Sequence, residues 1–141
     1  MIAAVVCTLG TTERGRCDDV ALWDVSVFLH VDAAYGGYFV FCRDSPLMSQ
    51  IAVSSFDALP KADSVSIDPH KLGYAPYPIE LFLLKNVHDT RYVNSTRKAY
   101  YIGSTSTSAF TIEGSRSGAL AACADFGHTI ATKTASQNST T

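Results

Sequence analysis

The sequence predicts an α/β fold with a mostly parallel β-sheet, and two observations support this prediction. Short runs of apolar and β-branched residues recur along the chain, separated by helical or loop segments. The runs are continuously apolar rather than alternating, which is typical of strands buried on both faces of a parallel sheet. Such sheets bind their ligands beyond the carboxyl ends of the strands. Each run here ends in small, polar or turn-forming residues, so a functional site is expected among those segments.

Four apolar runs are predicted as strands, because they combine β-branched residues with a turn signal at the end. They are Ala3–Cys7, Phe28–Asp32, Ser64–Ile67 and Leu81–Leu84. The stretch 86–108 is rich in Ser, Thr and Tyr and has no clear period, so it is expected to be a loop.

Two helices are expected. The first lies between the first two strands, over Asp18–Val27, with Asp18 or Asp19 as its N-cap. The last begins near Ser115 or Ser117. Its apolar residues recur at three- and four-residue steps and form one buried stripe: Leu120, Cys123, Phe126 and Ile130. Residues 134–141 are polar and are expected to be a disordered tail, which leaves residues 1–133 as the folded part.

Composition excludes several classes of protein. The 141 residues suit one modest domain, and 47% hydrophobic against 17% charged residues argues against intrinsic disorder. The net charge of −2 offers no basic surface, so neither a nucleic acid nor a membrane is expected as a partner. No apolar run reaches the roughly 20 residues of a membrane span. The 4 cysteines form no CxxC pair and no secretory signal is recognised, which predicts a cytoplasmic protein with reduced thiols.

Asp32 is the first candidate for chemistry, because it directly follows a predicted buried strand. An isolated buried carboxylate is costly, so this side chain needs a partner. One suitable partner is a protonated heteroaromatic nitrogen, as on the pyridine ring of pyridoxal phosphate. The position alone favours the alternative, in which Asp32 caps the next turn.

Lys71 is the second candidate, in the segment Asp68-Pro69-His70-Lys71-Leu72-Gly73-Tyr74 after the third strand. In a partly desolvated pocket a lysine amine loses proton affinity and becomes a nucleophile toward an aldehyde. His70 can donate to a phosphate oxygen, and Gly73 lets the backbone approach a ligand. Taken alone, the segment is more often an ordinary loop. Together, an aspartate and a lysine after two strands are the protein groups that pyridoxal phosphate enzymes need.

Four ordered blocks resemble the group II pyridoxal-phosphate-dependent amino-acid decarboxylases, most of all the tyrosine and glutamate decarboxylase branch. The blocks are residues 8–12, 30–37, 66–78 and 113–118. The resemblance implies an aspartate aminotransferase-like, fold type I large domain, of which residues 1–133 are a fragment. It also implies pyridoxal phosphate as cofactor, no metal, and a homodimer with an active site between two subunits.

The resemblance implies a role for each matching residue. Lys71 forms the internal aldimine with pyridoxal phosphate, and His70 contacts the phosphate and frames the aldimine. Asp32 pairs with the pyridine nitrogen, while Ala34 packs against one face of the ring. Thr12 lies near the phenolic oxygen of the cofactor or the substrate carboxylate. Lys71, His70 and Thr12 are therefore the expected catalytic residues.

Some roles stay open at this stage. Ser115 either reaches the phosphate of a neighbouring subunit or caps the last helix. Arg116 pairs with a carboxylate or is structural. The family often places its proton donor on a mobile loop, and the candidates here are Tyr92, Tyr100 and Tyr101.

The implied activity is decarboxylation of an L-amino acid, either aromatic or acidic, with release of carbon dioxide and protonation at Cα. Two alternatives remain. One is a different reaction on the same scaffold, such as transamination or carbon–carbon lysis. The other is a truncated remnant without catalytic activity.

The chain also departs from the family, whose members are several hundred residues long. Gly15–His30 is shorter than in relatives and leaves little room for a helix. The tripeptide Ile79-Glu80-Leu81 stands where relatives carry small residues including Gly, so a disturbed following strand is expected. Elements that cover the sheet in relatives are missing, and exposed apolar sheet surface is expected as a result.

Overall fold

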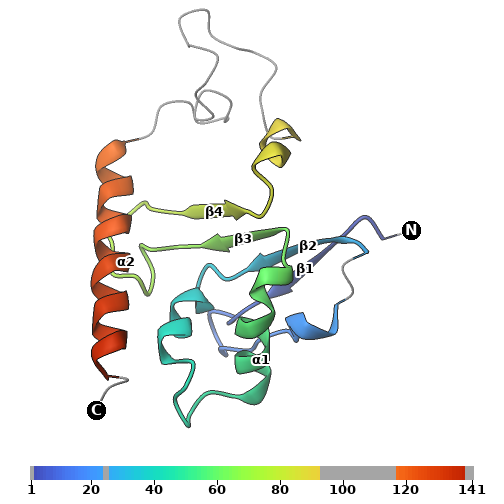
Figure 1. Cartoon of the computed structure of the whole chain (residues 1–141), viewed down its shortest axis with the longest axis horizontal. Coiled ribbons are helices and arrows are strands. Elements are labelled where there is room, and N and C mark those ends of the chain that lie inside the picture. The colour runs from blue at the N-terminus through green and yellow to red at the C-terminus, as the bar shows by residue number, and fades with distance from the viewer. Residues whose placement is uncertain (1, 24–25, 93–116, 139–141) are drawn as a thin grey trace, which may run out of the picture.

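The computed structural model describes residues 2–23, 26–92 and 117–138, and it shows an α/β fold around a four-stranded sheet in the order β1-β2-β3-β4 (Figure 1). The strands span Ala4–Thr8, Phe28–Asp32, Ser64–Ile67 and Leu81–Leu84. Strands β1, β2 and β3 pair in parallel, and β4 pairs antiparallel to β3. The mostly parallel sheet predicted from the sequence is confirmed, and only β1 starts and ends one residue later than expected.

Within the described ranges two α-helices accompany the sheet: α1 over Gln50–Ala58 and α2 over Gly118–Asn138. The same ranges contain four short 3₁₀ helices: η1 over Val20–Leu22, η2 over Gly36–Cys42, η3 over Leu59–Lys61 and η4 over Val87–Tyr92. Helix α1, which the sequence analysis did not predict, starts at a capping Ser49 whose Oγ accepts the Ala52 N–H at 3.2 Å. Helix α2 passes the ends of β3 and β4 (Figure 1).

The helix expected over Asp18–Val27 was a wrong prediction. Among the described residues of this stretch, 18–23 and 26–27, only the three-residue η1 forms, with Asp19 as its cap. Tertiary hydrogen bonds take the groups that a helix would have used. The Asp18 carboxylate accepts the Thr8 N–H at 2.8 Å, and Ser55 Oγ accepts the Val20 N–H at 3.2 Å while donating to the Asp18 carbonyl at 2.9 Å. The connection from β1 to β2 is therefore fastened to β1 and α1 instead of coiling on itself.

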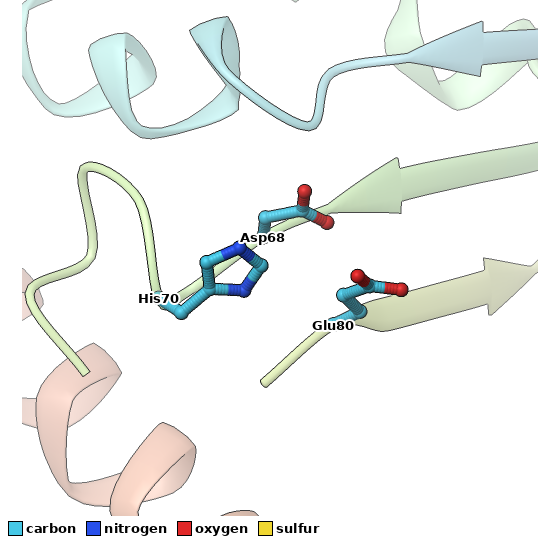
Figure 2. Close-up of side chains that lie close together, drawn as sticks. All are labelled: Asp68, His70 and Glu80. Atoms are coloured by element: carbon cyan, nitrogen blue, oxygen red, sulfur yellow. The ribbon is translucent and has the colours of Figure 1, made fainter. Parts of the chain in front are cut away.

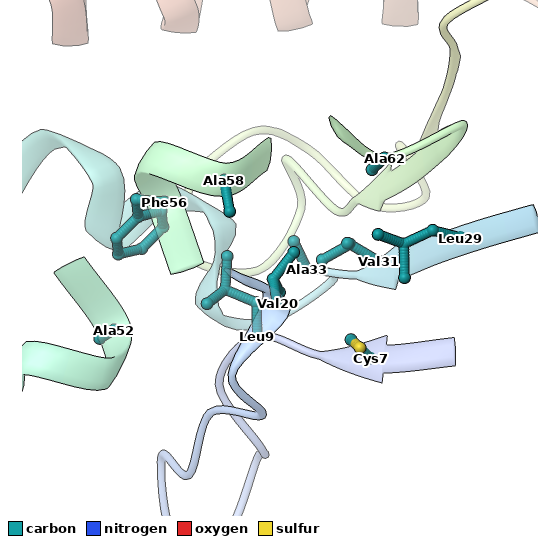
Figure 3. Close-up of a cluster of buried hydrophobic side chains, with 10 residues drawn as sticks. All are labelled: Cys7, Leu9, Val20, Leu29, Val31, Ala33, Ala52, Phe56, Ala58 and Ala62. Carbon is teal, nitrogen blue, oxygen red and sulfur yellow. The ribbon is translucent and has the colours of Figure 1, made fainter. Parts of the chain in front are cut away.

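The hydrophobic core lies between the sheet and α1 (Figure 3). Leu9, Val20, Leu29 and Val31 are the largest apolar side chains with almost no exposure, and burial of each contributes about 1.5–3 kcal/mol. Helix α1 faces them with Phe56 and with small alanines. Small residues allow a helix to lie close to the sheet, so a nine-residue helix is enough to cover this core.

The opposite face of the sheet carries exposed apolar side chains in the described part of the chain. Val6 is 63% exposed and Phe82 58% exposed, and Phe28 is also exposed. The His30 ring stacks on Phe82 with ring centroids 5.7 Å apart, and its Nδ1 lies 2.8 Å from Ser64 Oγ. The expectation of exposed apolar sheet surface is thus confirmed for this face.

Helix α2 differs from its predicted amphipathic pattern. Phe126, expected in the buried stripe, is 67% exposed, whereas Ala124 is buried. Helix α2 contacts η2. It also lies close to the loop 72–76, since a Cβ built at Gly127 would be 3.7 Å from the Gly73 carbonyl oxygen. The side chain of Ile130 lies outside the described residues. The helix continues to Asn138, five residues beyond the boundary expected at residue 133. None of the described helices is both long and apolar enough to cross a bilayer.

The expected disturbance after Pro78 was also wrong. Strand β4 pairs with β3 along its whole length, from Leu81 opposite Ile67 to Leu84 opposite Ser64. The bulky Ile79 is buried with 4% exposure, while Glu80 is exposed. The apolar Ile79 side chain is thus in the protein interior and the charged Glu80 side chain is in water, so neither residue prevents the strand from forming.

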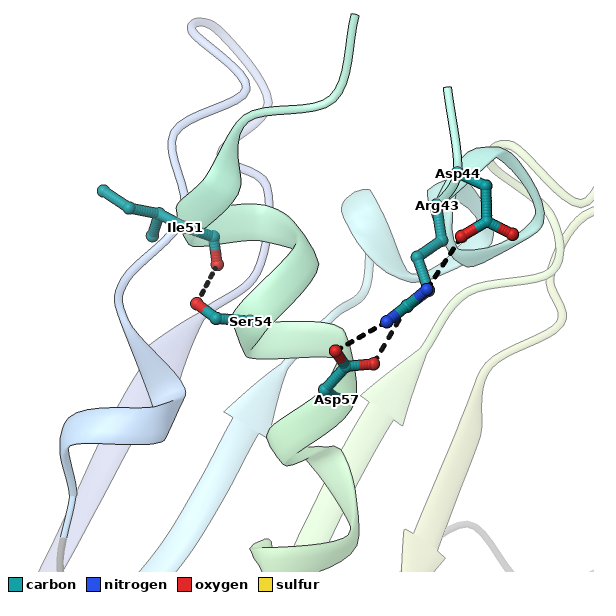
Figure 4. Close-up of polar contacts among 5 residues, drawn as sticks. All are labelled: Arg43, Asp44, Ile51, Ser54 and Asp57. Carbon is teal, nitrogen blue, oxygen red and sulfur yellow. Dashed lines mark hydrogen bonds and ion pairs between the residues drawn. The ribbon is translucent and has the colours of Figure 1, made fainter. Parts of the chain in front are cut away.

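A surface ion pair connects η2 to α1 (Figure 4). Arg43 donates from Nε and Nη2 to the two carboxylate oxygens of Asp57 at 2.9 and 2.6 Å, and from Nη1 to Asp44 at 2.7 Å. The hydrogen bonds to Asp57 raise the pKa of Arg43 and lower the pKa of Asp57. Because these groups are exposed, water and salt screen the interaction. The ion pair therefore adds little to the free energy of unfolding, and its main effect is to hold the end of η2 against α1.

Gly36 marks the closest approach between two loops that follow neighbouring strands. A Cβ built at this position would lie 1.9 Å from the Leu9 carbonyl oxygen and 2.8 Å from Gly10 Cα. Gly10 itself has a φ of +90°, which only glycine adopts without strain. The loops after β1 and β2 therefore meet through backbone alone.

We predict that Gly36→Ala lowers the free energy of unfolding by about 2–3 kcal/mol or more, because backbone atoms have to move to admit the methyl group. Urea unfolding followed by circular dichroism measures this loss. Gly118→Ala is the matched control, since no atom of the described residues lies within 4 Å of its built Cβ, and we expect a change within about 0.5 kcal/mol. Equal stability of Gly36→Ala and the wild type would contradict the close approach.

Candidate active site at the carboxyl edge of the sheet

The carboxyl ends of β1, β2 and β3 meet at one edge because these strands are parallel. Thr8, Asp32 and Ser66 occupy one row across the sheet. Backbone pairing continues past the strand ends, since the Leu9 N–H donates to the Asp32 carbonyl at 2.8 Å and the Ala33 N–H to the Ser66 carbonyl at 3.0 Å. The segments that follow β2 and β3 are thus held in place relative to each other.

The Asp32 carboxylate is half-buried and oriented by two hydrogen bonds. Its Oδ1 accepts the Ala34 N–H at 3.1 Å and the Ser66 hydroxyl at 3.4 Å. The turn-capping role that its position favoured is therefore real. It occupies only one oxygen, because within the described ranges no hydrogen bond is made by Oδ2. The second oxygen can accept from a ligand.

Lys71 lies in the turn that follows β3, and Asp68 holds its amine. The Lys71 Nζ is 2.8 Å from Asp68 Oδ2, and the Lys71 backbone N–H donates to the Asp68 carbonyl at 3.0 Å. Asp68 is buried, with a residue exposure of 8%, while the Lys71 side chain is 36% exposed. The turn thus brings a buried carboxylate and a half-exposed amine together at a spacing of three residues.

The hydrogen bond from Asp68 raises the pKa of Lys71, and the negative charges of Asp68, Asp32 and Glu80 add to the increase. Burial acts in the opposite direction and does not prevail. The sequence analysis expected desolvation to lower this pKa, and that expectation was wrong. The physical reason is that Lys71 reaches carboxylates at the sheet edge instead of a dry pocket, so the amine is held as an ammonium.

The His70 ring is fixed by two contacts. Its Nδ1 lies 2.6 Å from the Ile79 carbonyl oxygen, and because a carbonyl only accepts, Nδ1 carries the proton. The ring also meets Tyr77 edge-on, with centroids 4.8 Å apart. One polar atom each of Asp68, His70 and Glu80 lie within 4.8 Å of one another (Figure 2). Because Lys71 already occupies the Asp68 carboxylate, we assign this cluster to the electrostatic environment of Lys71.

The other residues predicted from the sequence have fewer described contacts with Asp32 and Lys71. The Ala34 N–H holds the Asp32 carboxylate, and its side chain is half-buried beside that group. Thr12 is exposed in the loop after β1, and no hydrogen bond joins it to Asp32 or Lys71. Ser115, Arg116, Tyr100 and Tyr101 lie outside the described residues. Tyr92 ends η4, and its side chain is likewise outside the description.

Sequence reasoning missed the role of Asp68. Nothing in the residue type distinguishes Asp68 from the many aspartates that end a strand. The signal that existed was the spacing Asp-x-x-Lys in a turn, which brings the two side chains together only if the turn closes as it does here. Ser66 was missed for a similar reason, since its contact with Asp32 depends on strand register.

Two hollows lie near the sheet in the described part. One of about 470 Å³ is formed by η2, the loop 72–76 and α2, and its lining includes Tyr38, Gly73 and Phe126. The other, of about 530 Å³, is lined by residues of β1 and η1 such as Val6 and Leu22. Neither of these two hollows includes Asp32 or Lys71.

A comparison with known families places the chain. The model of the pyridoxal-dependent decarboxylase conserved domain matches residues 1–123. The chain belongs to this family. The resemblance drawn from the four sequence blocks is thereby confirmed, and pyridoxal phosphate is the cofactor of the family.

Individual relatives agree. The chain is 32% identical over 127 residues to an L-tyrosine/L-aspartate decarboxylase of Methanocaldococcus jannaschii, covering 86% of the chain and 31% of the relative. It is 30% identical over 167 residues to an L-tyrosine decarboxylase of Enterococcus faecium, covering 92% of the chain and 27% of the relative. The chain thus spans about 30% of the length of these relatives.

Solved structures show the same fold. A sphingosine-1-phosphate lyase of Burkholderia pseudomallei superposes with a TM-score of 0.67 at 23% identity, over 89% of the chain and 29% of that structure. A glutamate decarboxylase domain from Vibrio parahaemolyticus superposes with a TM-score of 0.52 at 30% identity, over 64% of the chain and 19% of that structure. The fold is that of part of the large domain of fold type I enzymes, as the sequence predicted.

The described residues fit pyridoxal phosphate in the chemistry of their donor groups. The cofactor needs an amine that bonds its aldehyde carbon and a carboxylate that pairs with its ring nitrogen. Lys71 and Asp32 supply these groups at one edge, close enough for the charge of Asp32 to raise the pKa of Lys71. Asp32 also keeps Oδ2 available for a ring N–H.

Proposed function

We propose that the chain carries the lysine and the aspartate of a pyridoxal-phosphate-dependent carboxy-lyase that decarboxylates an aromatic or acidic L-amino acid. The observation that carries the proposal is the placement of Lys71 and Asp32 at one carboxyl edge of the sheet, in a member of the pyridoxal-dependent decarboxylase family. The names of the relatives, which include tyrosine and aspartate decarboxylases, support the two substrate classes.

In this proposal Lys71 holds the cofactor through its amine and yields its place to the amino group of the substrate. When bound, pyridoxal phosphate supplies a conjugated ring that takes up the electron pair released as the substrate carboxylate leaves as carbon dioxide. Asp32 keeps the ring nitrogen protonated, because a fixed carboxylate favours a nearby positive charge. Its geometry is prepared in advance by Ala34 and Ser66, so no reorganisation is needed.

The remaining residues have supporting roles. His70 presents a ring fixed by Ile79 and Tyr77 toward the phosphate, and Ala34 leaves room for one face of the cofactor ring. We place Thr12 near the phenolic oxygen or the substrate carboxylate, and Ser115 at a phosphate across a subunit boundary. The assembly proposed with these roles is a homodimer in the cytoplasm, and light scattering of the purified protein tests the dimer.

We predict that pyridoxal phosphate followed by borohydride reduction leaves a pyridoxyl group on Lys71, located by peptide mass analysis. Lys71→Ala removes this modification, since no other amine lies beside Asp32 in the described part of the chain. Lys85→Ala, which removes an exposed lysine after β4, leaves it unchanged. Modification spread evenly over several lysines, or none on Lys71, would contradict the proposal.

We predict that Asp32→Asn lowers the rate of carbon dioxide release from L-tyrosine or L-aspartate by about a hundredfold or more, the scale seen when one group that stabilises developing charge is removed. The amide keeps an oxygen for the Ala34 N–H and loses only the charge, so the turn stays formed. Asp44→Asn makes the same change of charge at an exposed site and is expected to keep the wild-type rate. A wild-type rate for Asp32→Asn would show that the ring nitrogen does not depend on this carboxylate.

A further inference from the structure

Asp68 is the carboxylate most closely tied to Lys71, and the two backbones are tied as well. The side chains meet at 2.8 Å, and the Lys71 N–H donates to the Asp68 carbonyl. The Asp68 N–H in turn donates at 3.3 Å to the carbonyl of Ala34, the residue whose own N–H orients Asp32. The position of the Lys71 amine is thus linked, through Asp68, to the segment that carries Asp32.

In this contact the carboxylate, but not the amine, is better shielded from water than in a surface ion pair. Asp68 is buried with 8% exposure, and a charge withdrawn from water needs a partner. The Arg43–Asp57 pair offers a comparison within the same chain, because its aspartate side chain is 54% exposed and that of Asp68 only 11%. Lys71 is therefore the group that compensates Asp68, and Asp68 keeps Lys71 from turning into solvent.

Among the described residues, three carboxylates act on the Lys71 amine, those of Asp68, Asp32 and Glu80, and His70 lies beside two of them. Asp32 and Glu80 act on Lys71 through their charge, while Asp68 also makes the direct hydrogen bond. His70 faces Asp68 and Glu80, and it donates its Nδ1 proton to Ile79. Only Asp68 combines contact with burial.

We propose that Asp68 is a positioning residue that holds the amine of Lys71 at the sheet edge and sets the pH at which this amine becomes free to react. The consequence for cofactor loading rests on the function proposed above. An ammonium has no lone pair, so Lys71 has to release one proton to water before it attacks an aldehyde. A carboxylate in contact with the ammonium shifts that release to higher pH.

The test measures the titration of Lys71 without the cofactor. Lysines are labelled by reductive methylation with ¹³C-formaldehyde, Lys71→Ala assigns the Lys71 signal, and its midpoint is followed by NMR. We expect Asp68→Asn to move this midpoint to lower pH and Asp44→Asn, with the same change of net charge, to leave it in place. An unchanged midpoint in Asp68→Asn, with a wild-type circular dichroism spectrum, overturns the proposal.

Asp68→Glu keeps the test decisive if Asp68→Asn fails to fold. It preserves the charge and lengthens the arm, so we expect a midpoint near that of the wild type, together with slower formation of the borohydride-trapped adduct. A wild-type rate of adduct formation in Asp68→Glu would overturn the positioning role.

A second measurement follows the rate of pyridoxal phosphate capture against pH. Below the midpoint the free amine rises about tenfold per pH unit, so the Asp68→Asn profile is expected to shift to lower pH by the amount seen in the NMR titration. The two proposals fail separately. If wild-type protein forms no adduct on Lys71, the proposed function fails, while the NMR titration still decides the role of Asp68.

Discussion

The parallel pairing of β1, β2 and β3 is the constraint on which the site depends. It brings Thr8, Asp32 and Ser66 into one row, and backbone hydrogen bonds extend that pairing into the segments carrying Ala34 and Asp68. A slip of one residue in β2 would turn Asp32 toward α1 and bury a charge in the core, so the hydrophobic pattern of β2 also protects the site. Core and chemistry are specified by alternate residues of the same five-residue strand.

The edge of the sheet is rich in carboxylates around one amine. Asp32, Asp68 and Glu80 all favour the charged form of Lys71, and burial is too weak to oppose them. This environment stabilises a resting ammonium, whereas attack on an aldehyde needs the neutral amine. The contact with Asp68 orients the Lys71 amine and favours its protonated form, which is not a nucleophile.

Much of the sheet could be predicted from sequence, because β2, β3 and β4 are short apolar runs that end sharply in Asp, Asp-Pro or Lys-Asn. Helix α1 could not, since Gln50, Ser54 and Asp57 interrupt its apolar residues and it buries mostly alanine and serine. The placement of Asp32 and Lys71 after two neighbouring strands could be predicted from the order of the motifs. The contact between Asp68 and Lys71 did not, because it depends on turn closure, and the direction of the Lys71 pKa depended on that contact in turn.

The face of the sheet that carries Asp32 links packing to chemistry. Because side chains alternate along a strand, Asp32 shares its face with Phe28 and His30, while Leu29 and Val31 face α1. In the described residues this face has exposed Val6 and Phe82, so water reaches the surroundings of Asp32. A carboxylate attracts a ring N–H more strongly when water is excluded, since the effective dielectric constant falls. Under the proposed function, a partner that covered this apolar face would therefore also strengthen the interaction of Asp32 with a bound ring.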